Sequence, residues 1–345
     1  MKIILTGGGT LGSVAPLIAV WQTLKEKDGD LETVFIGTAS GPEKDFLRQY
    51  PAIKFLTAPA GKLRRYFSFK NFLDPFLILA GFLKSLAIIL KYRSQIVVAA
   101  GGFVSVPVIY AAKILGLKII IHQLDVAPTL SNKLVQGLAD KITVTFEKSL
   151  NDFPKNKTIL VGSVLRQESK EAKKQESKEA KKQILVLGGG SGALALNQII
   201  EKIISLLPND IFIDHDTGKN KETNLSLPSY HQYPLLTDDY YQKIAAADLV
   251  ISRAGLSTLM ELAYFKKPAI IIPLPGSHQE LNARYFVEKE AIVYLKQNGL
   301  TAEILAGEIK QLFNNPETLK KLSANIGKIM NRGGEEKIAE LILNY

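Results

Sequence analysis

Two glycine-rich turns contain the residues best suited to binding a phosphorylated ligand. One covers residues 7–13 and follows the apolar run 2–6; the other covers residues 188–193 and follows the apolar run 184–187. Each turn opens a helical pattern, and the amides and dipole at a helix N-terminus attract anions. In the second turn Ser191 adds a hydroxyl donor. Both turns are therefore candidate phosphate sites, and tight turns without a ligand are the alternative.

The first turn also matches the dinucleotide-binding pattern G-x-G-x-x-G, through Gly7, Gly9 and Gly12. A dinucleotide fold places an acidic residue about 20 residues later, at the end of the second strand, to bind the ribose. Here that strand ends at residues 35–38, which read Phe-Ile-Gly-Thr. Because no carboxylate stands there, the sequence disfavours a nicotinamide or flavin cofactor, and we expect no cofactor.

Proton transfer has few candidate residues. The chain has no cysteine and only four histidines, His122, His215, His231 and His278. The absence of cysteine excludes disulfides, Cys-ligated zinc and thiolate catalysis, and it favours a reducing compartment. A general base must therefore be a histidine, a carboxylate or another oxygen or nitrogen group.

The elements that position these residues alternate between short apolar runs and helical patterns in both halves of the chain. Such alternation predicts parallel sheets with crossover helices. The 345 residues suit two domains better than one. We therefore expect an α/β protein of two Rossmann-like, doubly wound lobes facing across a cleft, with ligands bound beyond the carboxyl ends of the strands.

A charged duplication marks the boundary between the lobes. Residues 167–183 hold the octapeptide Gln-Glu-Ser-Lys-Glu-Ala-Lys-Lys twice in succession, and this repeat has no apolar face. It predicts a solvated linker or an exposed helix. The expected domains are an N-terminal lobe over residues 1–166, the linker over 167–183, and a C-terminal lobe over 184–345 whose last helix packs back on the first lobe.

Basic residues concentrate in one apolar segment. The net charge is +10, and residues 62–93 hold seven basic residues and a single acid, Asp74. These cations flank apolar runs, which favours an anionic membrane surface over nucleic acid. Residues 72–90 approach the length of a membrane span, but Asp74, Pro75 and Lys84 interrupt them. We expect an interfacial helix, with an ordinary core helix as the alternative. The basic residues are Lys62, Arg64, Arg65, Lys70, Lys84, Lys91 and Arg93.

The most specific pattern lies between residues 252 and 283. Residues 252–263 read Ser-Arg-Ala-Gly-Leu-Ser-Thr-Leu-Met-Glu-Leu-Ala, and residues 277–283 read Ser-His-Gln-Glu-Leu-Asn-Ala. Both elements resemble the nucleotide-sugar half of the MurG-type GT-B glycosyltransferases. Further matches lie at residues 6–10, 101–107, 122–125, 161–166 and 188–193. The resemblance thus covers nearly the whole chain outside the duplicated linker.

This resemblance implies a peripheral enzyme at the cytoplasmic face of the membrane. It would transfer N-acetylglucosamine from UDP-N-acetylglucosamine to lipid I, the lipid-linked acceptor of peptidoglycan synthesis, with inversion. By resemblance Glu261 accepts hydrogen bonds from two ribose hydroxyls. The other implied binding residues are Thr237, Ala254, Gly255, Leu256, Ser257 and Thr258 for the nucleotide, Gly190 and Ser191 for the pyrophosphate, His278 and Gln279 for the sugar, Arg166 on the UDP side, and Thr10, Leu11, Gly12 and Asp125 in the acceptor lobe.

The acceptor lobe departs from the family pattern. The family's first loop reads G-G-T-G-G-H, whereas this chain has Leu11-Gly12-Ser13, and a serine hydroxyl cannot accept a proton near pH 7. The family's H-E-Q-N element appears as His122-Gln123-Leu124-Asp125. Inverting transfer requires a group that takes the acceptor's proton. We hypothesise that Asp125 does so, with His122 and position 13 as weaker candidates and a loop-capping role for Asp125 as the alternative.

The sequence favours metal binding, and functions other than the implied sugar transfer, less strongly. Residues 28–30 and 214–216 both read Asp-x-Asp, which holds a divalent ion in other sugar transferases. The first lies in a polar connection and the second aligns with a non-ligand element of the family, so we expect no metal. The alternatives to the implied function are a related transferase with another UDP-sugar or lipid acceptor, a UDP-sugar epimerase of the same fold, and a catalytically impaired UDP-sugar-binding homologue.

Overall fold

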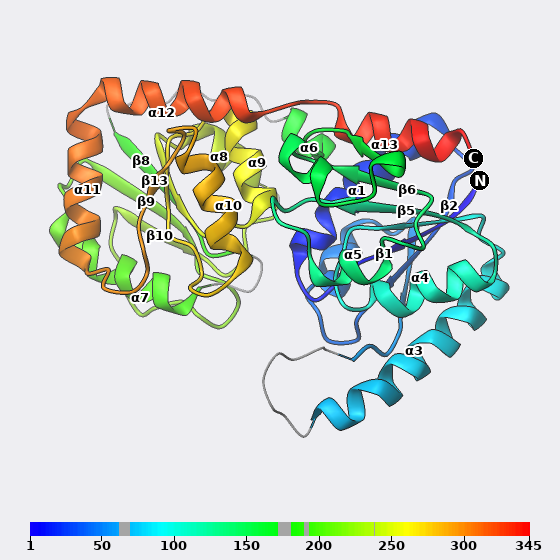
Figure 1. The fold of residues 1–345 in the computed structure, drawn as a ribbon. Coiled ribbons are helices and arrows are strands. Elements are labelled where there is room, and N and C mark those ends of the chain that lie inside the picture. The colour runs from blue at the N-terminus through cyan, green and yellow to red at the C-terminus, as the bar shows by residue number, and fades with distance from the viewer. Residues whose placement is uncertain (62–69, 172–180, 190–192, 238) are drawn as a thin grey trace. The chain divides into compact units, whose positions relative to one another are not determined.

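The computed structural model describes residues 1–61, 70–171, 181–189, 193–237 and 239–345. The chain forms two compact units (Figure 1). Unit 1 contains residues 1–166 together with residues 331–345, and unit 2 contains residues 167–330. Each unit is built around its own parallel sheet.

Unit 1 holds a seven-stranded sheet in the order β3-β2-β1-β4-β5-β6-β7. Its central strands are buried on both faces, as in other parallel sheets whose helices cover both sides. The strands are β1 (Lys2–Thr6), β2 (Glu32–Gly37), β3 (Ile53–Thr57), β4 (Ile96–Ala99), β5 (Lys118–Gln123), β6 (Lys141–Val144) and β7 (Thr158–Leu160).

Helices cover both faces of this sheet and enclose two apolar cores. One core joins Leu17 of α1 to Ile338 of α13, and the other joins Ile89 of α3 to Val108 of α4 and Val135 of α5. The final helix of the chain therefore packs on the first helix. The helices are α1 (Ala15–Lys27), α2 (Glu43–Phe46), α3 (Lys70–Tyr92), α4 (Ser105–Ile114), α5 (Leu130–Val135) and α13 (Gly334–Leu343).

Unit 2 holds a six-stranded parallel sheet in the order β10-β9-β8-β11-β12-β13. Ile200 of α7 and Ile309 of α11 share a core with Ile184 and Ile251 of the sheet. The strands are β8 (Lys182–Leu187), β9 (Ile211–Asp216), β10 (Tyr230–Tyr233), β11 (Leu249–Ser252), β12 (Ala269–Ile271) and β13 (Val293–Tyr294). The helices are α6 (Gln167–Glu171), α7 (Leu194–Ile203), α8 (Tyr240–Ala246), α9 (Leu256–Phe265), α10 (His278–Val287), α11 (Ala302–Asn314) and α12 (Pro316–Ile329).

The expected fold class, two α/β lobes with parallel sheets, is confirmed. Residues 331–345, which include the last helix, belong to unit 1, and unit 2 begins at residue 167, where the division drawn on the sequence had placed a separate linker. Within the duplicated segment, Gln167–Glu171 forms α6 and β8 begins at Lys182. Residues 172–180 of that segment lie outside the described residues.

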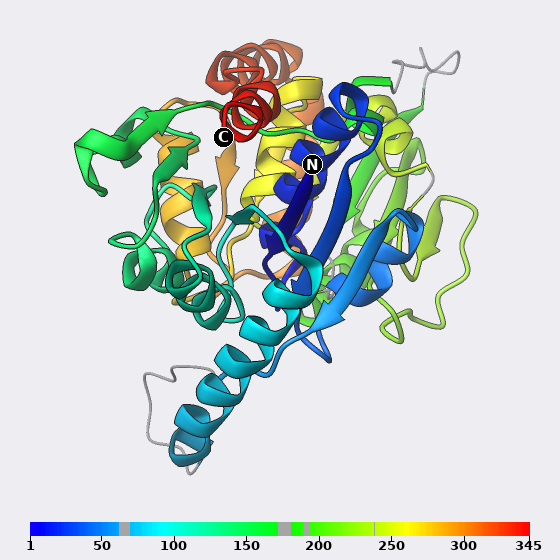
Figure 2. The ribbon, with the colours of Figure 1, turned by 90° about the vertical axis from the view of Figure 1, so that its right-hand side faces the viewer.

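Helix α3 includes the predicted interfacial helix and has two different faces. Ser85, Ile88 and Ile89 are buried against unit 1, and the helix runs close to the backbone of residue 59, where a Cβ on Gly81 would meet the Pro59 carbonyl oxygen. Its N-terminal half projects away from the sheet in both views (Figures 1 and 2). Among the described residues, Asp74–Tyr92 is the helical stretch long and apolar enough to cross a membrane.

Candidate functional site

Loops meet at the switch point of the unit 1 sheet, where the strand order reverses between β1 and β4. A Cβ on Gly102, in the loop after β4, would lie 2.6 Å from the carbonyl oxygen of Gly8, in the loop after β1. Gly102 has a φ of +83°, so only glycine suits both its conformation and this close approach. Ligands of open α/β sheets bind at such a position. The predicted binding residues of this unit, in the loop after β1 and at Asp125 after β5, therefore lie where the fold favours a ligand-binding site.

The first glycine turn is already occupied by side chains of the protein. The Gly8 amide donates to Ser13 Oγ at 2.9 Å, and the Gly9 amide donates to Glu43 Oε2 at 3.2 Å. The other oxygen of Glu43 accepts from the Thr38 amide at 2.7 Å, and the side chain is fully buried. The prediction that this turn binds phosphate through its amides is therefore not supported at Gly8 and Gly9. Of the turn's other predicted residues, Thr10 is exposed and Leu11 and Gly12 are half-buried.

Two candidate bases, Ser13 and His122, face the interior. Ser13 is 9% exposed, and its hydroxyl donates to the Thr10 carbonyl oxygen at 3.1 Å. His122 is 1% exposed, and its Nδ1 lies 3.0 Å from Thr143 Oγ1. Burial lowers the pKa of His122 to about 4. Because a bound acceptor cannot reach this ring, His122 is better suited to a structural role inside the sheet.

Asp125 lies in the connection between β5 and α5, where it is half-buried. Gln123 shapes this connection, because its Nε2 donates to the backbone carbonyl oxygens of Asp125 and Ala127, each at 2.9 Å. Its Oε1 accepts from Asn132 Nδ2 at 2.8 Å. These bonds fix the backbone at the carboxyl edge of the sheet. Of the three candidate bases, Asp125 is the one that a ligand at this edge can reach.

Arg166 is the last residue of the continuous part of unit 1. Its guanidinium lies 5.2 Å from the centroid of the Phe46 ring, and its Nη1 is 3.5 Å from the Tyr50 hydroxyl. A cation over an aromatic face is electrostatically favourable. These contacts anchor Arg166 within unit 1, and its assignment to the UDP side stays a prediction.

The switch point of the unit 2 sheet lies between β8 and β11. The second glycine turn follows β8, and residues 253–255 follow β11, so both emerge at the same edge. Gly190 and Ser191 lie outside the described residues. After the turn, Asn197 of α7 is buried and donates to the Thr217 carbonyl oxygen at 2.9 Å. The start of α7 is thereby tied to the end of β9.

Helix α9 carries most of the predicted nucleotide-binding residues. Ala254 is buried, Gly255 is the N-cap, and Leu256, Ser257 and Thr258 form the first turn. Ser257 and Glu261 are four residues apart and therefore share one face of the helix. The Ser257 hydroxyl is buried and makes no hydrogen bond among the described atoms. This face offers a hydroxyl and a carboxylate, which suits a ligand that carries hydroxyl groups.

The Glu261 carboxylate is held by two tyrosines that the sequence did not indicate as functional. Tyr240 donates its hydroxyl to Glu261 Oε2 at 2.7 Å, and Tyr241 donates to Oε1 at 3.0 Å. Glu261 itself is only 6% exposed, so it is a buried carboxylate and not an acid on the solvated face of the helix. The only signal in the sequence was a Tyr-Tyr pair at the start of a short helical pattern.

The loops around α9 are fixed by buried polar contacts. Arg253 donates to the Ile272 carbonyl oxygen at 2.9 Å and to Gln297 Oε1 at 2.6 Å, and Asn282 Nδ2 donates to the Ala254 carbonyl oxygen at 3.2 Å. The family motif residues Arg253 and Asn282 thus hold the site in place. Of the remaining predicted residues, His278 and Thr237 are exposed, and Gln279 accepts from the Leu274 amide at 3.0 Å.

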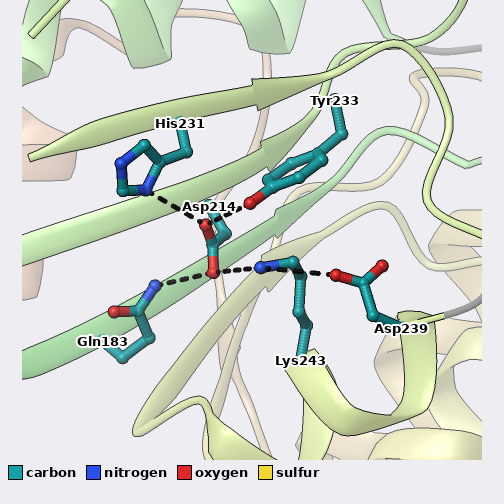
Figure 3. Close-up of polar contacts among 6 residues, drawn as sticks. All are labelled: Gln183, Asp214, His231, Tyr233, Asp239 and Lys243. Carbon is teal, nitrogen blue, oxygen red and sulfur yellow. Dashed lines mark hydrogen bonds and ion pairs between the residues drawn. The ribbon is translucent and has the colours of Figure 1, made fainter.

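Both Asp-x-Asp strings contain carboxylates that are paired with cations of the chain. Asp28 lies 3.0 Å from the Met1 amino group, which lowers the pKa of Asp28. Asp214 binds Lys243 Nζ at 3.1 Å and also accepts from Gln183 and Tyr233 (Figure 3). Burial raises the pKa of Asp216 to about 6. Among the described residues no cluster of three or more histidine, aspartate or glutamate residues could hold a metal ion.

Two α/β units, each built on a parallel sheet with a glycine-rich segment after the strand at its switch point, have the architecture of the GT-B fold. Residues 3–144 match the glycosyltransferase family 28 N-terminal domain, and residues 183–341 match the family 28 C-terminal domain. The chain belongs to glycosyltransferase family 28.

Curated relatives match both units together. The chain is 34% identical to the UDP-N-acetylglucosamine--N-acetylmuramyl-(pentapeptide) pyrophosphoryl-undecaprenol N-acetylglucosamine transferase of Geobacillus thermodenitrificans over 93% of each chain. It is 35% identical to the enzyme of that name from Borreliella burgdorferi, over 99% of this chain and 96% of the relative. Crystalline Acinetobacter baumannii MurG shares the fold, with a TM-score of 0.75, 22% identity and coverage of 100% and 99%. A UDP complex of S. aureus MnaA also shares it, with a TM-score of 0.72, 15% identity and coverage of 99% and 95%.

Proposed function

We propose that this chain transfers N-acetylglucosamine from UDP-N-acetylglucosamine to undecaprenyl-pyrophosphoryl-N-acetylmuramyl-pentapeptide (lipid I), which gives lipid II. The observation that carries this proposal is the nearly full-length match to relatives named for this reaction. That match covers the donor half and the acceptor half together.

Unit 2 supplies the donor site in this proposal. Glu261 accepts from the ribose hydroxyls, and the first turn of α9 approaches the nucleotide with its amides and the positive end of its dipole. The turn at residues 188–193 receives the pyrophosphate at the start of α7. His278 and Gln279, at the start of α10, reach the sugar. The backbone amides and the positive dipole ends at the starts of α7 and α9 stabilise the negative charge that grows on UDP as it leaves.

Unit 1 supplies the acceptor site. An acceptor hydroxyl attacks the anomeric carbon of the sugar as the bond from that carbon to the UDP oxygen breaks, and the hydroxyl proton passes to the base. Asp125 is the base in this proposal, because it is accessible at the carboxyl edge while Ser13 and His122 are buried. A base in reach of the proton contributes about 10²–10⁴-fold to such a reaction.

Purified protein given labelled UDP-N-acetylglucosamine and lipid I in detergent should form labelled lipid II. Omission of lipid I is the control, and label should then remain in the nucleotide sugar. Interconversion of sugar isomers without an acceptor would instead indicate an epimerase. Transfer only from another UDP-sugar, or only to another lipid, would indicate a related transferase. UDP binding without any transfer would indicate a catalytically impaired homologue.

Helix α3 supports the further proposal that the protein binds peripherally to an anionic membrane. Phe76, Leu79, Leu83 and Leu90 are between 55% and 73% exposed. Their spacing of three, four and seven residues places them on one face of the helix. Lys84 and Lys91 are exposed beside that face. An apolar face bordered by cations is typical of helices that lie in the headgroup region. Of the other basic residues of the segment, Arg93 is exposed just after α3, and Lys62, Arg64 and Arg65 lie outside the described residues.

The variant Leu79→Glu/Leu83→Glu should bind anionic vesicles at least about tenfold more weakly than wild type, because burying one leucine side chain is worth about 1.5–3 kcal/mol. Co-sedimentation with phosphatidylglycerol vesicles measures this loss. Leu225→Glu/Leu227→Glu is the matched control, since these leucines are 39% and 42% exposed in unit 2. Equal binding by both variants, or wild-type binding that is indifferent to lipid charge, would contradict the membrane proposal.

A further inference from the structure

Both oxygens of the Glu261 carboxylate receive a hydrogen bond from a tyrosine of helix α8. The distances are 2.7 Å from the Tyr240 hydroxyl to Oε2 and 3.0 Å from the Tyr241 hydroxyl to Oε1. Hydrogen bonds to an ionised acceptor are stronger than bonds between neutral groups. Two donors on different oxygens also fix the rotation of the carboxylate plane. The orientation of Glu261 is therefore set by α8 before any ligand binds.

Helix α8 is itself anchored to the sheet and to α9. Lys243 lies one turn after Tyr240, and its Nζ is 3.1 Å from Asp214 Oδ2 on β9 and 4.5 Å from the centroid of the Tyr233 ring (Figure 3). At the C-terminal end of α8, Lys267 Nζ donates to the carbonyl oxygens of Ala245 and Ala247 at 2.6 and 2.7 Å. These contacts hold the middle and the C-terminal end of α8, so its tyrosines present their hydroxyls from a fixed support.

The two tyrosines differ in burial. The Tyr241 side chain is 5% exposed, and its ring stacks on Phe265 of α9 with centroids 6.1 Å apart. Tyr240 is half-buried and meets Tyr241 edge to face at 5.0 Å. Water can replace a hydroxyl at a half-buried position more readily than at a buried one. Tyr241 should therefore contribute more to holding the carboxylate.

We propose that Tyr241, assisted by Tyr240, is a positioning residue that orients Glu261 toward a vicinal diol and so selects ribonucleoside over 2′-deoxyribonucleoside diphosphates. This inference rests on the proposed function, in which Glu261 binds the ribose of UDP. A carboxylate oxygen can accept two hydrogen bonds, so a tyrosine on each oxygen is compatible with a ribose hydroxyl on each. A carboxylate held in advance loses less rotational freedom when the nucleotide binds.

The test compares the binding of UDP and of 2′-deoxyuridine diphosphate by calorimetry on the full chain. Tyr241→Phe should weaken UDP binding about tenfold and deoxyuridine diphosphate binding about threefold, so the preference for the ribonucleotide falls. The deoxy compound loses less because it has one fewer hydroxyl to place on Glu261. Tyr240→Phe should have a smaller effect of the same kind. The ring remains in both variants, and a thermal melt monitors folding.

Two controls separate positioning from a general structural effect. Tyr294→Phe removes a hydroxyl from β13, the strand at the other edge of the sheet from β10, and should leave both affinities unchanged. In a Glu261→Gln background, Tyr241→Phe should change UDP affinity by less than about twofold, because coupled residues are not additive. If Tyr241→Phe lowered UDP affinity as much in the Glu261→Gln background as in wild type, the two residues would act independently and the proposal would be overturned.

The outcomes also distinguish this inference from the proposed function. Equal losses for both nucleotides in Tyr241→Phe, or an unchanged preference, would overturn the positioning role while UDP recognition by wild type stands. Wild-type protein that binds neither nucleotide, or binds both equally, would overturn the role of Glu261 and the positioning proposal together.

Discussion

Replacing Asp125 by asparagine should lower kcat for lipid I about 10²–10⁴-fold, because asparagine cannot take the proton of the acceptor hydroxyl. Asparagine keeps the size of the side chain, and the bonds from Gln123 reach the backbone carbonyl oxygens of residues 125 and 127, so the loop should persist. The affinity for UDP should not change, since Asp125 belongs to unit 1 and the proposed donor site to unit 2. Steady-state turnover and calorimetry with UDP measure the two quantities separately.

The control for Asp125 is Asp152→Asn, which removes the charge of an exposed aspartate elsewhere in unit 1 and should leave kcat unchanged. Turnover of Asp125→Asn equal to that of wild type would remove Asp125 as the base. Ser13→His provides the converse experiment. A gain in rate would show that the chain lacks an effective base at this edge, although the new side chain must first leave the interior position that Ser13 occupies.

Glu261→Gln should weaken UDP and UDP-N-acetylglucosamine binding about 100-fold. A hydrogen bond to a charged group contributes about 1.5–3 kcal/mol, and the variant exchanges an ionised acceptor for a neutral amide at the ribose. The loss should appear chiefly in KM for the donor, with a smaller change in kcat, if the ribose contact is equally strong in the ground state and the transition state. Calorimetry with UDP checks the binding loss directly.

Glutamine is preferred to alanine at position 261 for a structural reason. Alanine would leave the hydroxyls of Tyr240 and Tyr241 without their acceptor, and an unsatisfied buried donor costs about 1–3 kcal/mol of stability. Glu308→Gln, a half-buried position on α11, is the control and should bind UDP as wild type does. Unchanged UDP affinity in Glu261→Gln would remove the assignment of the ribose site.

Local sequence patterns predicted the strands that are buried and the helices that have a strong hydrophobic periodicity. The apolar runs at residues 2–6 and 184–187, each expected before a helical pattern, correspond to β1 and to most of β8. Strands β3, β7 and β10 were not predicted. β3 and β10 lie at sheet edges and carry polar residues such as Lys54 and His231, so their sequences lack the continuous apolar run of a central parallel strand.

The glycine turns show how far a motif predicts a site. Both turns stand after a strand and before helical structure, as their spacing indicated. Yet the spacing could not reveal that Glu43, 34 residues after Gly9, fills the first turn with its carboxylate. A motif predicts the local backbone conformation. Which group accepts a hydrogen bond from a backbone amide of the turn depends on the distant side chain that the fold brings there.

The amino-acid sequence alone was sufficient to predict the fold class, the parallel sheets, the family resemblance and Glu261 as a candidate residue. These predictions follow from local hydrophobic spacing and from motifs a few residues long. The partners of the buried charges depended on the folded structure. Tyr240 and Tyr241 reach Glu261 from 20 or more residues away, and Lys243 reaches Asp214 across 29 residues. Such contacts form when strands and helices pack, because a buried carboxylate needs donors and the packing selects which ones are near.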